Sequence, residues 1–288
     1  MNFKKLTKTL YITITVLTAL STLSLLASFM FAFDMTNGYF TNGFLPVIFK
    51  IVFILGTVLS LASAFAFDKH KIIKTDNTVK GWRILVILAA ALVILSQIFN
   101  RFALNKYFAF AAVGICFFAL YVFFCATRGG YTYSHFKLVC LLLSVIFPVI
   151  MTIDNDAALY RHSNSVENHL SAIFSIAFIM YILYEGNRLF TGSHSRWHFP
   201  SMLFLSHSGL SISLAYIIAY LNYDVNERIR FYQMILVLLI GIVAEIQLWR
   251  FVKIAESRTK EEWDQLEAPE TSEQEITEES TNEEKTDE

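Results

Sequence analysis

Apolar residues run through this chain in long stretches that are separated by short polar segments. Each stretch is close to the ~20 residues that an α-helix needs to cross ~30 Å of hydrocarbon. The stretches cover residues 10–33, 44–67, 82–100, 107–126, 136–153, 168–186, 200–221 and 231–253. We therefore predict an all-α fold, a polytopic integral membrane bundle of about eight transmembrane helices.

The stretch 136–153 has the weakest pattern, because it is short and contains Pro148. A proline within a helix lacks the amide donor and frees the carbonyl four residues earlier, here that of Ser144. Helices in membranes tolerate this loss when neighbouring groups satisfy the freed carbonyl. We still predict a span here.

Composition supports a membrane protein. Hydrophobic residues make up 55% of the chain and charged residues only 16%, against about 25% charged residues in ordinary globular proteins. Lys4, Lys5 and Lys8 precede the first apolar stretch, as in a signal peptide. That stretch is longer than the ~7–15 apolar residues of a signal peptide, so we expect an uncleaved first span.

Basic residues are distributed unequally between the two sides of the predicted bundle. When the connecting segments are assigned alternately, 16 lysines and arginines fall on the side of the two termini and 6 on the other side. Because basic loops stay in the cytoplasm, this asymmetry predicts that both termini are cytoplasmic. An odd number of spans would shift the later connecting segments to the other side, and the lysines and arginines would no longer be concentrated on one side.

The end of the chain differs from the rest. Residues 261–288 contain thirteen acids and one base, whereas residues 1–260 carry a net charge of +11. The tail is also rich in Glu, Thr and Ser, a composition typical of disorder. We therefore divide the chain into a transmembrane domain, 1–255, and an acidic disordered cytoplasmic tail, 256–288. The tail either docks a protein partner or is simply solvated, and we expect no nucleic-acid partner.

Three ionisable residues lie within predicted spans. Glu245 is in the eighth span, His207 in the seventh, and Lys50 near the outer end of the second. An ionised side chain at the centre of a span costs at least ~2.5 kcal/mol unless it is paired, protonated or in contact with water. Glu245 and His207 are candidates for an ion path and for each other's partner, or they are structural polar contacts. Lys50 either extends to the outer surface or pairs with an acid there.

Glu185 and Arg188 are three residues apart on one helix face, at the end of the sixth span. This spacing predicts an ion pair that anchors the helix at the cytoplasmic interface, or a contact to a gate or a partner.

Close-packing patterns also occur. Gly56, Ser60 and Ala64 recur every fourth residue in the second span, and small residues at this spacing let membrane helices approach closely.

Nothing in the sequence predicts a cofactor or a metal. The three cysteines form no CxxC pair, and His194 and His198, in a predicted inner loop, have no nearby acidic or thiol ligand. The outer loop that begins at Asp154 is rich in acids and histidines but matches no strict metal motif.

Motifs of the familiar enzymes are missing as well. The chain has no GxSxG, HExxH or GxxxxGK[ST] motif. Glu185 and Arg188, with His207, share residue types with membrane-embedded CAAX-type proteases, but those enzymes need paired glutamates and a second histidine. An enzyme is therefore the least favoured class.

One segment resembles known sequences. Residues 164–170, followed by an apolar span that ends in residues 183–190, resemble a pattern in uncharacterised bacterial multi-span membrane proteins with a Glu-x-x-Arg-Leu helix end. Val166 stands where that pattern has a proline, and the resemblance covers about 30 residues. It implies a bacterial inner-membrane location and no particular activity.

Two functional classes are left open by the sequence. The first is transport of a small solute or ion along a path lined by Glu245, His207 and Lys50. The second is a non-enzymatic sensor or assembly partner that acts through the tail and the basic inner loops. Transport is favoured because many proteins of this shape are transporters, which is an analogy of fold.

Overall fold

The computed structural model describes residues 3–34, 39–40, 43–66, 83–102, 106–127, 132–159, 166–192, 195–222 and 228–257. Within them the helices are α1 (Phe3–Ala32), α2 (Phe44–Ala66), α3 (Arg83–Phe102), α4 (Lys106–Thr127), α5 (His135–Leu143), α6 (Ile146–Leu159), α7 (Val166–Thr191), α8 (His198–Asn222) and α9 (Arg228–Ser257). By length and apolar composition they make eight candidate membrane spans, with α5 and α6 forming one of them. The predicted all-α bundle of eight spans is confirmed.

The span that contains Pro148 is broken into two helices. α5 ends at Leu143, residues 144 and 145 form a turn, and α6 starts at Ile146. The carbonyl of Ser144, which Pro148 cannot satisfy, accepts the amide of Phe147 at 3.1 Å. Gly114 of α4 lies against this break, because a Cβ atom there would be 2.6 Å from the Phe147 nitrogen. The freed carbonyl is thus satisfied locally, and the bend fits against a glycine.

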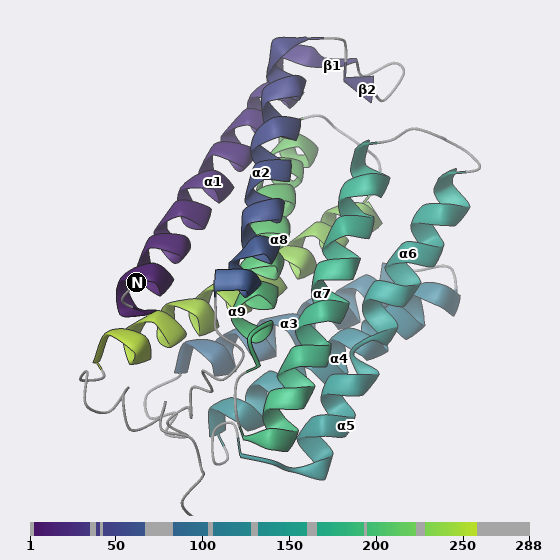
Figure 1. Cartoon of the computed structure of the whole chain (residues 1–288). Helices are drawn as coiled ribbons and strands as arrows, with labels where there is room; N and C mark the ends of the chain where they lie inside the picture. Colours follow the sequence, from purple (N-terminus) through teal and green to yellow (C-terminus); the bar gives the residue numbers. More distant parts are fainter. Residues whose placement is uncertain are drawn as a thin grey trace, which may run out of the picture.

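α8 is the central helix of the bundle. It packs against α1, α2, α7 and α9, and Figure 1 shows it between the α1–α2 pair and α7. Of its most apolar membrane window, 78% is buried inside the protein. We call the end of the bundle where α1 begins and α9 ends the terminal side (Figure 1). α1 and α8 both run away from it, so they pack in parallel.

A short hairpin that the sequence pattern did not predict follows α1. β1 (Phe33–Asp34) pairs in antiparallel fashion with β2 (Tyr39–Phe40). Its rings join a cluster: Phe29 of α1 lies 5.0 Å from Phe40 and 4.8 Å from Tyr216 of α8, between ring centroids. The cluster of Phe29, Phe33, Phe40 and Tyr216 covers the α1–α8 contact at the end opposite the terminal side.

The outward faces of the helices suit hydrocarbon. Large apolar side chains such as Phe31, Phe65 and Ile87 are 77%, 80% and 66% exposed. A soluble protein avoids such continuous apolar faces because they promote association. In a bilayer they meet lipid chains, so the chain is a multi-pass membrane protein with the bilayer as its partner.

Several predictions concern segments outside the described residues. α9 continues to Ser257, two residues beyond the predicted domain boundary. Residues 258–288, which make up nearly all of the acidic tail, and residues 160–165 of the outer loop lie outside the part that is described. A partner that binds the tail therefore stays a prediction, as does the cytoplasmic position of the two termini.

Candidate functional site

Glu245 joins three helices in the half of the membrane nearer the terminal side. Its Oε1 accepts a hydrogen bond from the Tyr11 hydroxyl of α1 at 2.6 Å. Its Oε2 accepts one from the Ser206 hydroxyl of α8, also at 2.6 Å. Within the described part of the chain, no lysine, arginine or histidine forms an ion pair with it. The carboxyl is partly buried in a membrane span and is held only by neutral donors.

His207 is buried one residue further along α8 and points to other partners. Its Nε2 lies 3.1 Å from the Phe53 carbonyl of α2, and its Nδ1 lies 2.9 Å from the Thr18 hydroxyl of α1. The Phe53 ring stacks on the imidazole at 5.2 Å. Gly56 makes room for the ring, because a Cβ atom there would be 2.4 Å from it. The strip of small residues predicted on α2, which begins at Gly56, thus accommodates a side chain from α8.

The Thr18 hydroxyl can form a hydrogen bond with both the neutral and the charged form of His207. A carbonyl only accepts hydrogen bonds, so Nε2 must carry a proton to bind Phe53. In the neutral ring Nδ1 is then an acceptor, and Thr18 donates to it. In the charged ring Nδ1 donates, and the Thr18 hydroxyl can turn to donate to the Ile14 carbonyl, 2.8 Å away. Either form of His207 therefore has complete hydrogen bonding in this pocket.

Two buried hydroxyls lie about one turn further from the terminal side. Ser211 follows His207 by four residues on α8, and Ser21 follows Thr18 by three on α1, so each is on the same helix face as its predecessor. Both serines are 0% exposed. Neither Oγ atom has a hydrogen-bond partner. A buried hydroxyl without a partner costs about 1–3 kcal/mol. The contact between α1 and α8 therefore retains two serine hydroxyls whose hydrogen-bonding capacity is unused.

Glu185 lies at the centre of a second polar cluster, on the other side of α8. Its carboxylate accepts hydrogen bonds from Arg188 at 2.5 Å and from the Tyr121 hydroxyl of α4. It also contacts His198 Nε2 of α8 at 2.6 Å. Glu185 and Tyr121 are 0% exposed, and Arg188 and His198 are at most 5% exposed. The predicted pair of Glu185 and Arg188 forms, but it is buried within a larger network.

His198 was assigned from sequence to a loop, and that assignment is wrong. α8 begins at His198, two residues before the predicted start of the span, and the imidazole faces Glu185. Pro200 could have revealed this, because proline is well tolerated in the first turn of a helix. The histidine near Glu185 is therefore His198, whereas His207 faces α1 and α2.

The cluster extends to Cys125 and Lys137. The Cys125 thiol of α4 contacts the Tyr121 hydroxyl and interacts electrostatically with Glu185, Arg188 and Lys137. Lys137 of α5 is only 4% exposed, and its ammonium donates to the Thr132 carbonyl at 3.4 Å. The sequence did not reveal this grouping, because its members come from two pairs of consecutive helices, α4–α5 and α7–α8, that are separated in the chain.

The three residues predicted to line a path are not in mutual contact. Glu245 and His207 both bond to α1, at Tyr11 and Thr18, but not to each other. Lys50 of α2 is exposed on the outside of the bundle. Because Phe49 and Phe53 of α2 are buried, the lysine lies on a different face from the one that contacts His207.

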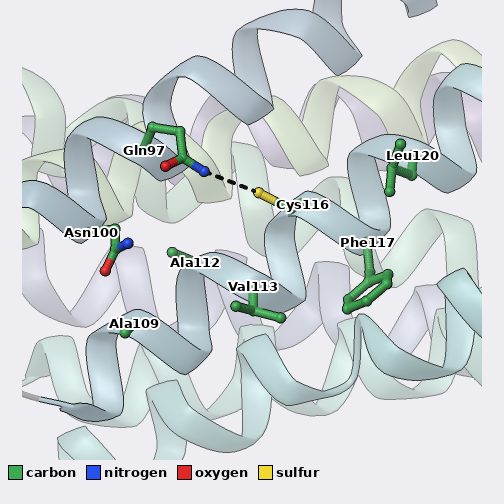
Figure 2. A pocket seen from close by; sticks show the side chains of 8 residues that line it. All are labelled: Gln97, Asn100, Ala109, Ala112, Val113, Cys116, Phe117 and Leu120. Atoms are coloured by element: carbon green, nitrogen blue, oxygen red, sulfur yellow. Dashed lines mark hydrogen bonds between the residues drawn. The ribbon is translucent and has the colours of Figure 1, made fainter.

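A groove of about 200 Å³ lies between α3 and α4. Figure 2 shows the Gln97 amide of α3 pointing across it to the Cys116 sulfur of α4 at 3.7 Å, with Asn100 nearby. The remaining lining is apolar: Ala109, Ala112, Val113, Phe117 and Leu120. The described residues that line the groove carry no charge, and none of them belongs to either carboxyl cluster.

Neither cluster has the composition of a metal site. Within the described ranges, no three His, Cys, Asp or Glu side chains come together in a way that could hold a metal ion. No known protein family, no curated protein and no solved structure matches this chain.

Proposed function

We propose that this multi-pass membrane protein transports a small ion, and that the ion is the proton. The observation that carries the proposal is the bonding of Glu245, whose partners are the hydroxyls of Tyr11 and Ser206. An ionised carboxylate without a cation partner is costly in a membrane span. Its protonated form is neutral, and the hydroxyl groups can rotate to accept its proton. Such a carboxyl can gain and lose a proton without breaking an ion pair.

A route away from Glu245 is supported by the neighbouring residues. Glu245 and His207 both bond to one face of α1, through Tyr11 and Thr18, and Thr18 accommodates both protonation states of His207. The buried hydroxyls of Ser211 and Ser21 follow at the next turn. Hydroxyl and imidazole groups can both donate and accept a proton, so this order of residues suits proton movement along α1 and α8.

The ring cluster of Phe29, Phe33, Phe40 and Tyr216 lies at the far end of the same helix pair. Its edge-to-face contacts are apolar and exclude water from the contact. In the proposed transporter this arrangement corresponds to a state that is closed on the side opposite the termini. Release of the proton on that side would require Tyr216 and Phe29 to separate.

Proton flux into liposomes tests the proposal. The purified full-length chain is reconstituted with an entrapped pH-sensitive dye, and a potassium diffusion potential provides the driving force. We expect potential-driven acidification with the wild type and its loss with Glu245→Gln. The glutamine keeps the shape of the side chain and, like the protonated acid, both donates and accepts hydrogen bonds, but it cannot take part in proton exchange. Glu245→Asp is expected to retain part of the proton flux, because aspartate also carries a carboxyl group.

Gln247→Met is the matched control. Gln247 is another buried polar residue on α9, but it bonds to Tyr181 of α7 at 2.8 Å and so faces away from Glu245. This variant should conduct like the wild type. The proposal is wrong if the wild type carries no proton flux above empty liposomes, or if Glu245→Gln carries the full wild-type flux.

A further inference from the structure

A second cavity lies where α4 ends and α5 begins, on the terminal side. Its volume is about 390 Å³, within the range of small-ligand sites. Its walls are Phe124, Thr132, Ser134, Phe136 and Lys137. The rings of Phe124 and Phe136 meet at 5.0 Å, edge to face. Among the described residues, the cavity thus combines aromatic rings, the hydroxyl groups of Thr132 and Ser134, and Lys137.

Among the described residues that line this cavity, Lys137 carries the charge. The side chain is 4% exposed and lines the cavity. Its ammonium donates a hydrogen bond to the Thr132 carbonyl at 3.4 Å, among other interactions. A lysine that borders an open cavity favours an anion there, because opposite charges attract more strongly where they are partly shielded from water.

The first turn of α5 adds to this preference. Ser134 is the residue before the helix, and its side chain makes no capping hydrogen bond. The hydroxyl is therefore available to the cavity, and the first amide groups of α5 point towards this end of the helix. The positive end of the helix dipole acts in the same direction as Lys137.

An apolar face continues from the cavity along α5 into the membrane. Phe136, Val139 and Leu142 are each 50% exposed, and Leu143 is 36% exposed. Tyr133, at the start of this segment, is also exposed and contacts Phe190 of α7. Exposed aromatic residues at a helix end are typical of the level of the lipid headgroups.

We propose that this cavity binds the phosphate headgroup of an anionic phospholipid, whose acyl chains lie along the exposed face of α5. The lipid comes from the leaflet on the terminal side, which the charge distribution predicts to be cytoplasmic. A soluble phosphate ester would satisfy Lys137 and Ser134 but would leave the apolar face of α5 without a partner. Charge and continuity together favour the lipid.

Native mass spectrometry of the full-length protein in detergent tests this site. Phosphatidylglycerol and phosphatidylcholine with the same acyl chains are titrated separately, and glycerol 3-phosphate serves as the soluble phosphate. We expect phosphatidylglycerol to bind at least about fivefold more tightly than phosphatidylcholine, as one lysine near a headgroup provides. Glycerol 3-phosphate should not bind at the concentrations at which phosphatidylglycerol saturates the site. Equal binding of the two lipids, or tight binding of glycerol 3-phosphate, would overturn the proposal.

Variants separate this site from general attraction between lipid and lysine. Lys137→Gln should remove the preference for phosphatidylglycerol, and Lys137→Arg should retain most of it. Lys50→Gln is the matched control, because Lys50 is exposed on α2 and lines neither cavity. An unchanged preference in Lys137→Gln, or an equal loss in Lys50→Gln, contradicts the assignment. The comparison of lipids on the wild type does not depend on whether any variant folds.

Discussion

The two glutamates buried in this bundle are held in opposite ways. Glu185 is fully enclosed by Arg188, His198 and Tyr121, so its negative charge meets a guanidinium and an imidazole. Glu245 is partly buried and meets two hydroxyl groups. Both carboxyl groups receive short hydrogen bonds from neighbouring helices. They differ in that only Glu185 has cationic or potentially cationic partners among the described residues.

The difference indicates what each carboxyl group can do. A proton added to Glu185 would leave the Arg188 charge buried without its counter-ion, so the network favours one protonation state. A proton added to Glu245 leaves no such charge behind. Burial of an acid in a membrane protein is thus compatible with a structural role or a functional one, and the partners decide between them.

Loss of the Glu185 carboxylate should produce the largest effect on stability. Glu185→Ala removes the acceptor that satisfies Arg188, His198 and Tyr121 together. Breaking a buried ion pair by removing one partner typically costs about 3–5 kcal/mol. We expect a strongly lowered thermal unfolding midpoint of the purified protein in detergent.

Glu245→Gln provides the comparison in the same experiment. Glutamine can accept a hydrogen bond from one of the two hydroxyls and donate to the other, which can rotate to accept it, and it leaves no charge unpaired. We expect its unfolding midpoint to stay close to that of the wild type. Equal destabilisation by the two substitutions would show that the distinction between the two carboxyl groups does not hold.

An intermediate effect is expected at the glycine that accommodates His207. The Cβ atom of Gly56→Ala would lie 2.4 Å from the imidazole, so either the ring or α2 must move. Overpacking of this kind costs about 1–3 kcal/mol. The unfolding midpoint should fall, and His207 should lose its bond to the Phe53 carbonyl.

A double variant identifies the cause. In a His207→Ala background the ring that collides with the added methyl group is absent, so Gly56→Ala should cost much less there. Full additivity of the two substitutions would mean that Gly56 is needed for some other reason, since residues in direct contact are expected to couple.

The smallest effect on stability is expected from two serines of α8. Ser211 has a buried hydroxyl without a partner, whereas the Ser213 hydroxyl donates to the Gly209 carbonyl of its own helix at 2.5 Å. Ser211→Ala should leave stability unchanged or slightly raised, and Ser213→Ala should lower it by about 0.5–1 kcal/mol. In the liposome assay the order should reverse, with Ser211→Ala slowing proton flux and Ser213→Ala leaving it unchanged. Equal flux in the two variants would exclude Ser211 from the route.

Sequence reasoning predicted the architecture well because span length and hydrophobicity act locally. Each helix must satisfy its own backbone and present ~20 apolar residues, and both requirements can be read from a continuous segment. The break before Pro148 was harder to predict, because it depends on how Ser144 and Phe147 rearrange and on Gly114 of another helix. The β1–β2 hairpin was not predicted because it consists of two pairs of residues.

Partners of the polar residues were less predictable than their positions. Depth in the membrane placed Glu245 and His207 near each other, but side-chain direction separates them, since adjacent positions on a helix point ~100° apart. Ser206 faces Glu245 of α9, and His207 faces α2 and α1. Tyr121 was missed as a partner of Glu185 because it lies 64 residues away on another helix. His198 was missed because it was assigned to a loop, although Pro200 marks the first turn of α8.

The hydrogen bond between Tyr11 and Glu245 also has a consequence for biosynthesis. It joins the first span to the last, across 234 residues of sequence. At about 5–20 residues per second, the ribosome needs roughly 10–50 s to reach Glu245 after Tyr11 has been made. During that interval α1 is in the membrane, and the Tyr11 hydroxyl does not yet have Glu245 as its hydrogen-bond acceptor. Arrival of α9 then closes the bundle, so a chain truncated before Glu245 would present an unfinished edge to quality-control proteases.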